Sequence, residues 1–309
     1  VNIDNCNDAL PQQQKDLGLE VKQSNLCSEI TLPTNEERTA VCCLSSVNVE
    51  KFDDWSKDEQ FIEDLVTMLD NVLEQFIESA VDTTHYALGS YRANAERFKN
   101  YLKEDKNAYR KSAFSAYRER SIGLGAMGFH SYLQSKAVPF EGLRATSINH
   151  QVFKHIKEKA VGASKKLAND RGEAPDMVGS GLRNAHLLAV APNASSSIIC
   201  NGTSPSIEPS RANVYTHKTL SGSYKVQNKH LKNLLESKNK NTIEVWKDIA
   251  AHEGSVQHLD FLTDEEKEVF KTAPELNQIW IVEHAHQRQQ YICQSQSVNL
   301  FFIPPKATE

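Results

Sequence analysis

The sequence predicts a helix-rich α/β fold in which short buried strands alternate with amphipathic helices. Over residues 56–80, apolar side chains recur at spacings of three and four, which is typical of a helix with one buried face. Short apolar runs elsewhere have the length of strands that are covered on both faces. Strands that alternate with helices favour a parallel sheet. The chain has 309 residues, of which 39% are hydrophobic, enough for a sizeable core, and we expect one domain.

The helical pattern is clearest where Phe61, Leu65, Leu69 and Phe76 fall on one face. A later and longer pattern ends in Asn-Asp-Arg-Gly, a plausible helix stop at Gly172. The predicted helices are 56–80, 107–120, 146–171, 226–238, 243–252 and 275–293.

Three apolar runs, 40–49, 121–127 and 187–191, are the predicted strands. Residues 204–224 are rich in Ser, Pro and Gly, and we interpret them as a long ordered loop. The sequence contains no internal repeat and no low-complexity segment.

The charge pattern argues against nucleic acid or a membrane as partner. A formal net charge of -5 gives no strong positive field, so a bound phosphate would have to be held by local groups. No apolar run approaches the ~18 residues of a membrane helix, and the first thirty residues lack a signal-peptide core. We therefore expect a cytoplasmic protein.

Cysteine and histidine spacing predicts free thiols and no metal site. The six cysteines are too few for a secreted disulfide scaffold in a chain of this length, and no C-x-x-C is present. His284 and His286 are two apart in a predicted helix, and His150 and His155 are five apart, so neither pair suits a helical metal site. Surface or core roles are expected for them.

Residues 24–30 read SNLCSEI, and their alternation raises a chemical possibility. On an extended backbone, Asn25, Cys27 and Glu29 would point the same way, with neighbours in the set about 6 to 7 Å apart. A thiol between an amide and a carboxylate is a reactive arrangement. The alternative is that Cys27 is a small buried hydrophobe and that Asn25 and Glu29 are exposed on a strand edge.

Cys42 and Cys43 are adjacent in the first predicted strand, 40–49. Adjacent strand residues point to opposite faces, so these two thiols are not expected to bridge each other. At most one of them can face the same cavity as Cys27. Core packing is the alternative for both.

A serine-rich turn follows the strand at 187–191. After Pro192, Asn193 can cap a short helix whose first turn offers free N–H groups and the hydroxyls of Ser195, Ser196 and Ser197. That combination is suited to a phosphate, although an ordinary capped helix would have the same sequence.

Gly123, Gly125 and Gly128 fit the pattern G-x-G-x-x-G of dinucleotide-binding proteins. Hardly any strand precedes the first glycine, and no second βαβ half with a ribose-binding acid follows. We interpret these glycines as permitting close packing.

Five segments together point to a known family. In order, SNLCSEITLPT, ERTAVCCLSSVN, RSIGLGAMGFHSYL, LLAVAPNASSSIICNGTSPSIEP and YICQSQSVNLF closely resemble the catalytic large subunit of aerobic class I ribonucleotide reductase, of bacterial or phage type. The resemblance covers essentially the whole chain. It implies part of a ten-stranded α/β barrel with residues 24–30 as a catalytic finger loop inside it.

The resemblance also implies roles for the residues of this loop. Cys27 matches the thiol that becomes a thiyl radical and abstracts the 3′ hydrogen of a ribonucleoside diphosphate. Glu29 matches the general base for the 3′-hydroxyl, and Asn25 matches a residue that binds and orients the ribose.

Two further sites follow from the same resemblance. Cys42 matches one of two cysteines that reduce the sugar by closing into a disulfide, and Cys43 departs from commoner versions. The residues that match the segment holding the substrate diphosphate are Pro192, Asn193, Ala194, Ser195 and Ser196.

Other parts of such an enzyme have no counterpart here. The chain begins at Val1 without an initiator Met and ends in PPKATE, which suggests a piece of a longer protein. The family's ATP cone, the effector sites for ATP and deoxynucleotides, the first part of the barrel, the partner redox cysteine, a radical-relay tyrosine pair and a terminal cysteine pair are not found. We therefore expect residues 1–309 to be a single catalytic-barrel portion that is inactive alone.

The implied partners are the missing large-subunit segments, the small β subunit, thioredoxin or glutaredoxin, and a second large subunit. No cofactor is expected on this chain, because the radical would come from the di-metal tyrosyl-radical small subunit. Two alternatives remain. One is a reductase that takes its radical from adenosylcobalamin, and the other is an inactive nucleotide-binding fragment or split-gene product.

Overall fold

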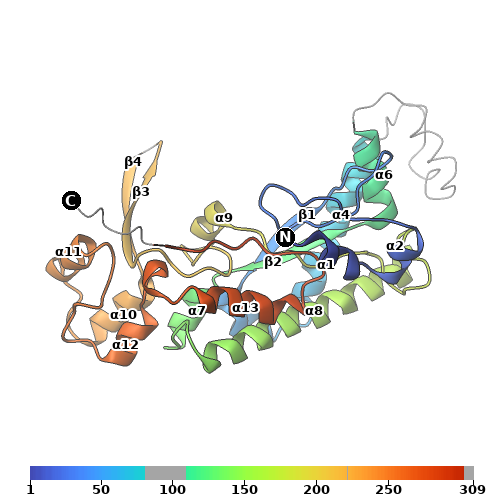
Figure 1. Cartoon of the computed structure of the whole chain (residues 1–309). Coiled ribbons are helices and arrows are strands. Elements are labelled where there is room, and N and C mark those ends of the chain that lie inside the picture. Colours follow the sequence, from blue (N-terminus) through green and yellow to red (C-terminus); the bar gives the residue numbers. More distant parts are fainter. Residues whose placement is uncertain (81–108, 221, 303–309) are drawn as a thin grey trace, which may run out of the picture.

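The computed structural model of the chain describes residues 1–80, 109–220 and 222–302 (Figure 1). The strands are β1 (Cys43–Asn48), β2 (Ile122–Met127), β3 (Val214–Thr219) and β4 (Gly222–Gln227). The helices are α1 (Ile3–Asp8), α2 (Gln12–Asp16), α3 (Phe52–Trp55), α4 (Phe61–Ala80), α6 (Arg110–Glu119), α7 (Phe129–Ser135), α8 (Leu143–Arg171), α9 (Ala194–Ile199), α10 (Lys229–Ser237), α11 (Ile243–Ala251), α12 (Asp264–Val269) and α13 (Ile279–Gln289), with short 3₁₀ turns at Val49–Lys51 and Ala273–Glu275.

All six predicted helices are present, as α4, α6, α8, α10, α11 and α13. Residues 107 and 108 of the second prediction lie outside the described residues. The predicted stop after α8 is confirmed, because Gly172 has a φ of 85° and Arg171 is the last helical residue. Within the described ranges, no helix is both long enough and apolar enough to cross a membrane.

Two of the three predicted strands are present as β1 and β2, and the third, 187–191, joins them only through isolated parallel bridges. Strand β1 pairs with β2, with Cys43 opposite Ile122. Parallel bridges from Leu124 to Leu188 and from Val190 to Gln296 add two more extended segments. The order across the sheet is therefore β1, β2, 187–190 and 294–297. The fold is α/β and helix-rich, as predicted, but the described residues form an open sheet rather than a closed ten-stranded barrel.

Helices cover one face of this sheet and bury its apolar side chains. Helix α4 packs on β1 and β2, and α8 packs against α4 and α13. Val47, Leu124, Leu73 and Phe153 are among the residues of the main core, and each is almost fully buried. Every residue of β2 is buried, as expected for a central parallel strand.

The interpretation of 204–224 as a loop is wrong in its second half. Strands β3 and β4 form an antiparallel hairpin there, with Val214 opposite Gln227. The sequence Val-Tyr-Thr-His-Lys-Thr is rich in β-branched and aromatic residues, a strand signal that the Ser and Pro content upstream obscured. Residue 221 lies outside the described residues. With α10, α11 and α12, this region surrounds a second apolar cluster that includes Leu231, Trp246 and Phe270.

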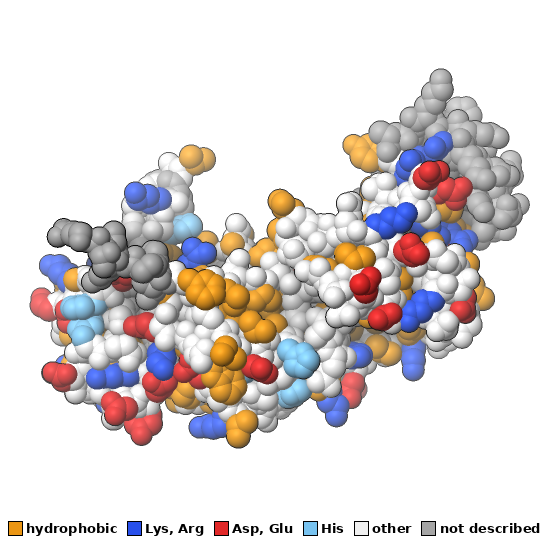
Figure 2. Space-filling view, in the orientation of Figure 1, with side chains coloured by type: hydrophobic (Ala, Val, Ile, Leu, Met, Phe, Trp, Pro, Cys, Tyr) orange, Lys and Arg blue, Asp and Glu red, His pale blue; other side chains and the backbone are white. Residues whose placement is uncertain are grey.

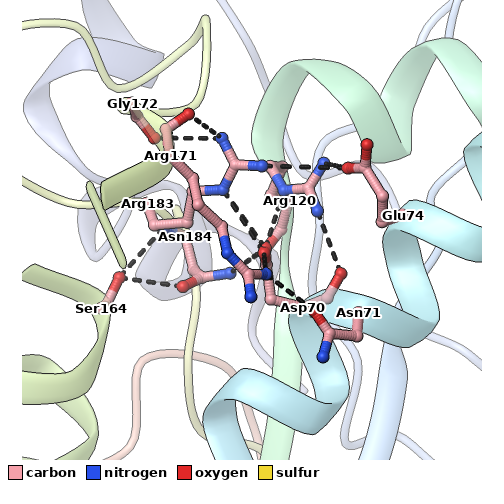
Figure 3. A network of polar contacts seen from close by, with 9 residues as sticks. All are labelled: Asp70, Asn71, Glu74, Arg120, Ser164, Arg171, Gly172, Arg183 and Asn184. Atoms are coloured by element: carbon pink, nitrogen blue, oxygen red, sulfur yellow. Dashed lines mark hydrogen bonds and ion pairs between the residues drawn. The ribbon is translucent and has the colours of Figure 1, made fainter. Parts of the chain in front are cut away.

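A buried network of charges joins α4 to the residues that follow α6 and α8 (Figure 3). The Asp70 carboxylate on α4 accepts hydrogen bonds from Arg120 Nε at 2.7 Å and from Arg171 Nη1 at 3.0 Å. Arg183 Nε approaches the same carboxylate, at 3.4 Å. Burial acts to raise the pKa of Asp70, but the guanidinium groups outweigh it and hold that pKa below its ordinary value.

Candidate active site

The loop at 24–30 is a tight turn, not the extended segment that the sequence analysis assumed. Asn25 N donates to the Ile30 carbonyl at 3.2 Å, and Ile30 N donates to Asn25 Oδ1 at 3.0 Å. Ser28 has a φ of 68° and its N–H donates to the Asn25 carbonyl. The left-handed residue breaks the two-residue alternation, so the expected alignment of Asn25, Cys27 and Glu29 is wrong.

The turn separates the thiol from the carboxylate. Cys27 is exposed at the tip of the turn, next to Leu26, which is 99% exposed. Glu29 is 3% exposed, and its Oε2 is buried without a hydrogen-bond partner in the described structure. An unpartnered carboxylate oxygen in the interior is costly, and it is common where a ligand supplies the partner.

Ser295 anchors this loop to the parallel sheet. Its N–H donates to the Glu29 carbonyl at 3.0 Å, and its own carbonyl accepts from Val190 N at 3.1 Å. Val190 lies near the end of the strand that leads into Pro192 and α9. One residue therefore joins the turn that carries Cys27 to the strand that carries the serine-rich segment.

Cys42 faces the side of the sheet opposite the α4 helix. A Cβ built on Gly123 would lie 3.2 Å from Cys42 Sγ and 2.4 Å from Leu44 Cδ2, so both side chains project over that glycine. Ser46 follows on the same face by strand alternation, and its hydroxyl donates to Asn193 Oδ1 at 3.0 Å. Cys42 and Asn193 therefore belong to the same face of the sheet.

Cys43 points the other way and packs against the main apolar core. The prediction that the two cysteines cannot serve the same face is confirmed by the pairing of β1. Burial raises the pKa of both thiols, strongly for Cys42 and less for Cys43. Both are therefore held as neutral thiols at neutral pH.

The serine-rich turn forms a short helix, as predicted, but its cap differs. Helix α9 begins at Ala194, and Asn193 precedes it with a φ of 51°, its side chain bonded to Ser46 instead of to the helix N–H groups. Ser195 and Ser196 are exposed. Ser197 is 3% exposed and donates its hydroxyl to the Ala194 carbonyl.

The ends of neighbouring strands meet at one edge of the sheet. Asn48 ends β1, Gly128 follows β2 and Asn193 follows 187–191. A Cβ on Gly128 would lie 2.5 Å from both Asn48 Oδ1 and Thr203 Oγ1, so these segments approach closely. The carboxyl edge of a parallel sheet is where ligands commonly bind in α/β proteins.

The glycines of the G-x-G-x-x-G pattern are packing residues, as interpreted. Gly123 and Gly125 lie within β2, not in a turn between a strand and a helix. A Cβ on Gly125 would lie 2.6 Å from the Ala189 carbonyl oxygen. The absence of side chains allows 187–190 to pair with β2.

Sequence reasoning missed Gln294, Ser295 and Ser46. Gln294 Nε2 donates to the Ile122 carbonyl at 3.0 Å and lies 3.6 Å from Cys42 Sγ, while its Oε1 is buried without a partner in the described structure. The segment YICQSQSVNLF contributed only to the resemblance. Its alternation of Gln294 and Gln296 with smaller residues was the available signal of a strand.

His284 has a role in the core and His286 lies on the surface, as expected for these histidines. His284 is fully buried, with Nε2 at 2.8 Å from the Phe140 carbonyl, and burial lowers its pKa to about 4. His150 contacts the Tyr291 hydroxyl at 3.1 Å, and His286 is exposed on α13.

The hydrogen bonds of the described structure do not join Cys27 directly to Cys42 or to α9. They do attach these residues to adjoining segments of the parallel sheet. The Cys27 turn is bonded to Ser295, Ser46 is bonded to Asn193, and Cys42 lies over Gly123 of β2. A thiol such as Cys42, on the sheet face that also carries the start of a serine-rich helix, can combine redox chemistry with binding of an anion.

Comparison with known proteins identifies the family of the chain. The family model "ribonucleotide reductase, barrel domain" matches residues 1–180 and 175–309. The ribonucleoside-diphosphate reductase large subunit of Invertebrate iridescent virus 3 is 51% identical over 305 residues, covering 98% of this chain and 44% of that protein. The putative large subunit from Frog virus 3 is 46% identical, covering 97% of this chain and 49% of the relative.

A solved structure is also similar. It is the Actinobacillus ureae class Id ribonucleotide reductase alpha subunit, with a TM-score of 0.82 and 40% sequence identity over 96% of this chain and 51% of that one. The chain thus spans about half the length of these relatives. From the match along its whole length, the chain belongs to the ribonucleotide reductase barrel-domain family.

Proposed function

We propose that this chain is the C-terminal portion of the catalytic large subunit of a ribonucleoside-diphosphate reductase. In the complete enzyme it would convert ribonucleoside diphosphates to 2′-deoxyribonucleoside diphosphates for DNA synthesis. The observation that carries the proposal is the position of Ser295 between the Cys27 turn and the strand that leads to Asn193. The family match along the chain supports the same reaction.

The proposed chemistry begins and ends at Cys27. Its thiyl radical takes the 3′ hydrogen atom, Glu29 accepts the proton of the 3′-hydroxyl, and the 2′-hydroxyl takes a proton from one of the redox thiols and leaves as water. Glu29 is suited to this role because Oε2 has no protein partner in the described structure. Asn25 would orient the ribose, although its Oδ1 now closes the loop.

Two electrons are then needed to reduce the sugar. We assign Cys42 as one of the two thiols that supply them by closing into a disulfide, the other thiol lying on a segment upstream of this chain. Cys42 suits this role because it shares a face with Ser46 and Asn193, while Cys43 packs in the core. After the reduction, Cys27 returns its hydrogen atom to the 3′ carbon.

The diphosphate would lie at the start of α9. Free N–H groups of the first helical turn and the exposed hydroxyls of Ser195 and Ser196 are suitable donors. Pro192, Asn193 and Ala194 would complete this segment through their backbone. The net charge of -5 supplies no strong positive field, so recognition would rest on directed hydrogen bonds.

The rest of the assembly follows from the family. Residues 1–309 would be a single portion of a ten-stranded barrel, completed by large-subunit segments that pair with the open sheet and enclose the exposed Cys27. The small subunit would supply the radical, thioredoxin or glutaredoxin would restore the disulfide, and two large subunits would associate in the cytoplasm. ATP and deoxynucleotide effectors would bind the other segments.

The decisive experiment combines this chain with the complementary large-subunit segments and the small subunit, and measures deoxyribonucleotide formation. We expect activity only in the full mixture, and none with Cys27→Ser, while nucleotide binding is nearly unchanged. Retained turnover in that variant would refute the assignment.

The same assay separates the alternatives. Activity that needs adenosylcobalamin and no small subunit would indicate the cobalamin-dependent class, whereas the similarity to a class Id alpha subunit favours class I. Nucleotide binding without turnover in any mixture would indicate an inactive fragment.

A further inference from the structure

A cluster of one aspartate and two histidines lies far from the proposed active site, on the part of the chain that holds α11. Asp248 and His252 are four residues apart, so they lie on one face at the end of that helix. His258 comes from the turn that follows. Histidine side chains reach the surface at this end of the molecule, in the region of α11 (Figures 1 and 2).

The Asp248 carboxylate is the centre of the cluster. Its Oδ2 lies 3.1 Å from His258 Nε2, and its Oδ1 lies 3.3 Å from His252 Nδ1. The two imidazole rings stack with centroids 3.7 Å apart and planes inclined by 21°. One carboxylate oxygen and two ring nitrogens are thus all within 4.8 Å of one another.

The apolar packing underneath fixes both halves of the cluster. Trp246 and Ile249 on α11 are buried in the second apolar cluster. Val256 and Leu259, on either side of His258, are buried in the same cluster. The turn is therefore held against the helix by core contacts of its own, and this packing brings the three polar side chains together. Such prior positioning lowers the entropic cost of binding a ligand.

The ring nitrogens restrict how an ion could bind. His258 Nδ1 is buried and has no hydrogen bond in the described structure, so Nε2 is the nitrogen available to a ligand. His252 Nδ1 also lies 2.9 Å from the Asp248 carbonyl oxygen. This nitrogen would have to leave the carbonyl oxygen in order to bind the ion. Two imidazoles and one carboxylate are a donor set that suits Zn²⁺ and related divalent transition metals better than Mg²⁺ or Ca²⁺.

We propose that Asp248, His252 and His258 bind one divalent transition-metal ion, of which Zn²⁺ is the representative, with water at its remaining position. The ion takes the place of the direct contacts between the imidazoles and the carboxylate, and it joins the end of α11 to the following turn. No metal site was expected from the histidine pairs or from the missing C-x-x-C, and the spacing of Asp248 and His252 is the sequence signal for this one.

The test uses the full chain after treatment with a chelator. Calorimetric titration with Zn²⁺ should give one site per chain, and Co²⁺ should give the visible absorption of a four-coordinate site with nitrogen and oxygen ligands. Asp248→Asn, His252→Gln and His258→Gln should each weaken Zn²⁺ binding by more than about tenfold, because even outer partners of metal ligands contribute that much. Zn²⁺ should also raise the Tm of the unsubstituted chain alone.

His286→Gln is the matched control, since His286 is an exposed helical histidine outside the cluster. It should bind Zn²⁺ like the unsubstituted chain, and circular dichroism should show that all variants remain folded. Unchanged Zn²⁺ affinity in a combined Asp248→Asn and His258→Gln variant would overturn the proposal, as would the absence of a single stoichiometric site in the unsubstituted chain. Enzyme activity enters none of these measurements, so the result does not depend on the proposed function.

Discussion

Glu29 and Ser295 are joined by a backbone hydrogen bond of 3.0 Å, although they lie near opposite ends of the described chain. This bond attaches the turn that carries Cys27 to the parallel sheet. Because the Ser295 carbonyl also accepts from Val190 N, the position of the turn depends on the strand that leads to Asn193.

Ser295→Pro should release the Cys27 turn, because proline has no N–H to donate to Glu29. We expect faster hydrogen exchange of the backbone of residues 24–30, measured by mass spectrometry. Ser295→Ala keeps the N–H and should exchange like the unsubstituted chain. Equal exchange rates in both variants would show that the turn is held by other contacts.

Cys42 and Cys43 should differ sharply in the completed enzyme. Cys42→Ala should abolish repeated turnover, because the sugar can then no longer be reduced by a disulfide-forming pair. Cys43→Ala removes only a core contact and should keep activity, with a modest loss of stability. The check is deoxyribonucleotide formed per enzyme in the presence of thioredoxin. The assignment fails if the Cys43 variant is the inactive one.

The sequence was sufficient for the six longer helices that it predicted and for β1 and β2, because their signals are local, but it missed the hairpin of β3 and β4 and most of the shorter helices. The three-and-four spacing of α4 and the apolar runs of β1 and β2 need no distant partner to be recognised. The 24–30 turn was missed because Ser28 adopts a left-handed φ without the glycine or asparagine that usually marks it. The alternation of adjacent side chains showed that Cys42 and Cys43 point to opposite faces of the sheet, but it did not show which of them faces the core.

What the sequence could not supply is the set of distant contacts. Gln294 reaches Cys42, and Ser46 reaches Asn193, only because β1, 187–190 and 294–297 lie in one sheet. The spacing of Asp248 and His252 is visible in the sequence, but the approach of His258 depends on how the turn packs.

Gly123→Ala should destabilise the sheet. The new Cβ would lie 2.4 Å from Leu44 Cδ2 and 3.1 Å from Ala189 Cβ, and overpacking of this kind costs about 1 to 3 kcal/mol. Gly162→Ala is the matched control in α8, where an added Cβ would contact nothing within 4 Å. Because alanine favours a helix more than glycine does, this change should raise the free energy of unfolding by about 0.5 to 1 kcal/mol. Urea unfolding measures both. A neutral Gly123 variant would mean that β1 can move away from β2 at little cost.

Asp70→Asn should be the most damaging of these changes to stability, because it leaves Arg120, Arg171 and Arg183 without their shared carboxylate. Breaking a buried ion pair costs about 3 to 5 kcal/mol. Asp54→Asn is the control. The Asp54 side chain is 73% exposed, and its Oδ2 lies 3.7 Å from Lys51 Nζ. Replacing this carboxylate should change the free energy of unfolding by less than about 0.5 kcal/mol.

The same carboxylate predicts a dependence on pH with a definite sign. The folded-state pKa of Asp70 lies below its ordinary value, so the folded protein binds fewer protons there than the unfolded chain does. Its stabilising contribution is complete above the unfolded pKa of about 3.9 and is lost as the pH falls through the lower, folded value. Urea unfolding between neutral and acidic pH should therefore show a gap between the Asp70→Asn variant and the unsubstituted chain that narrows only in acid. A gap that stayed constant to the lowest pH would mean that Asp70 acts through packing rather than through its charge.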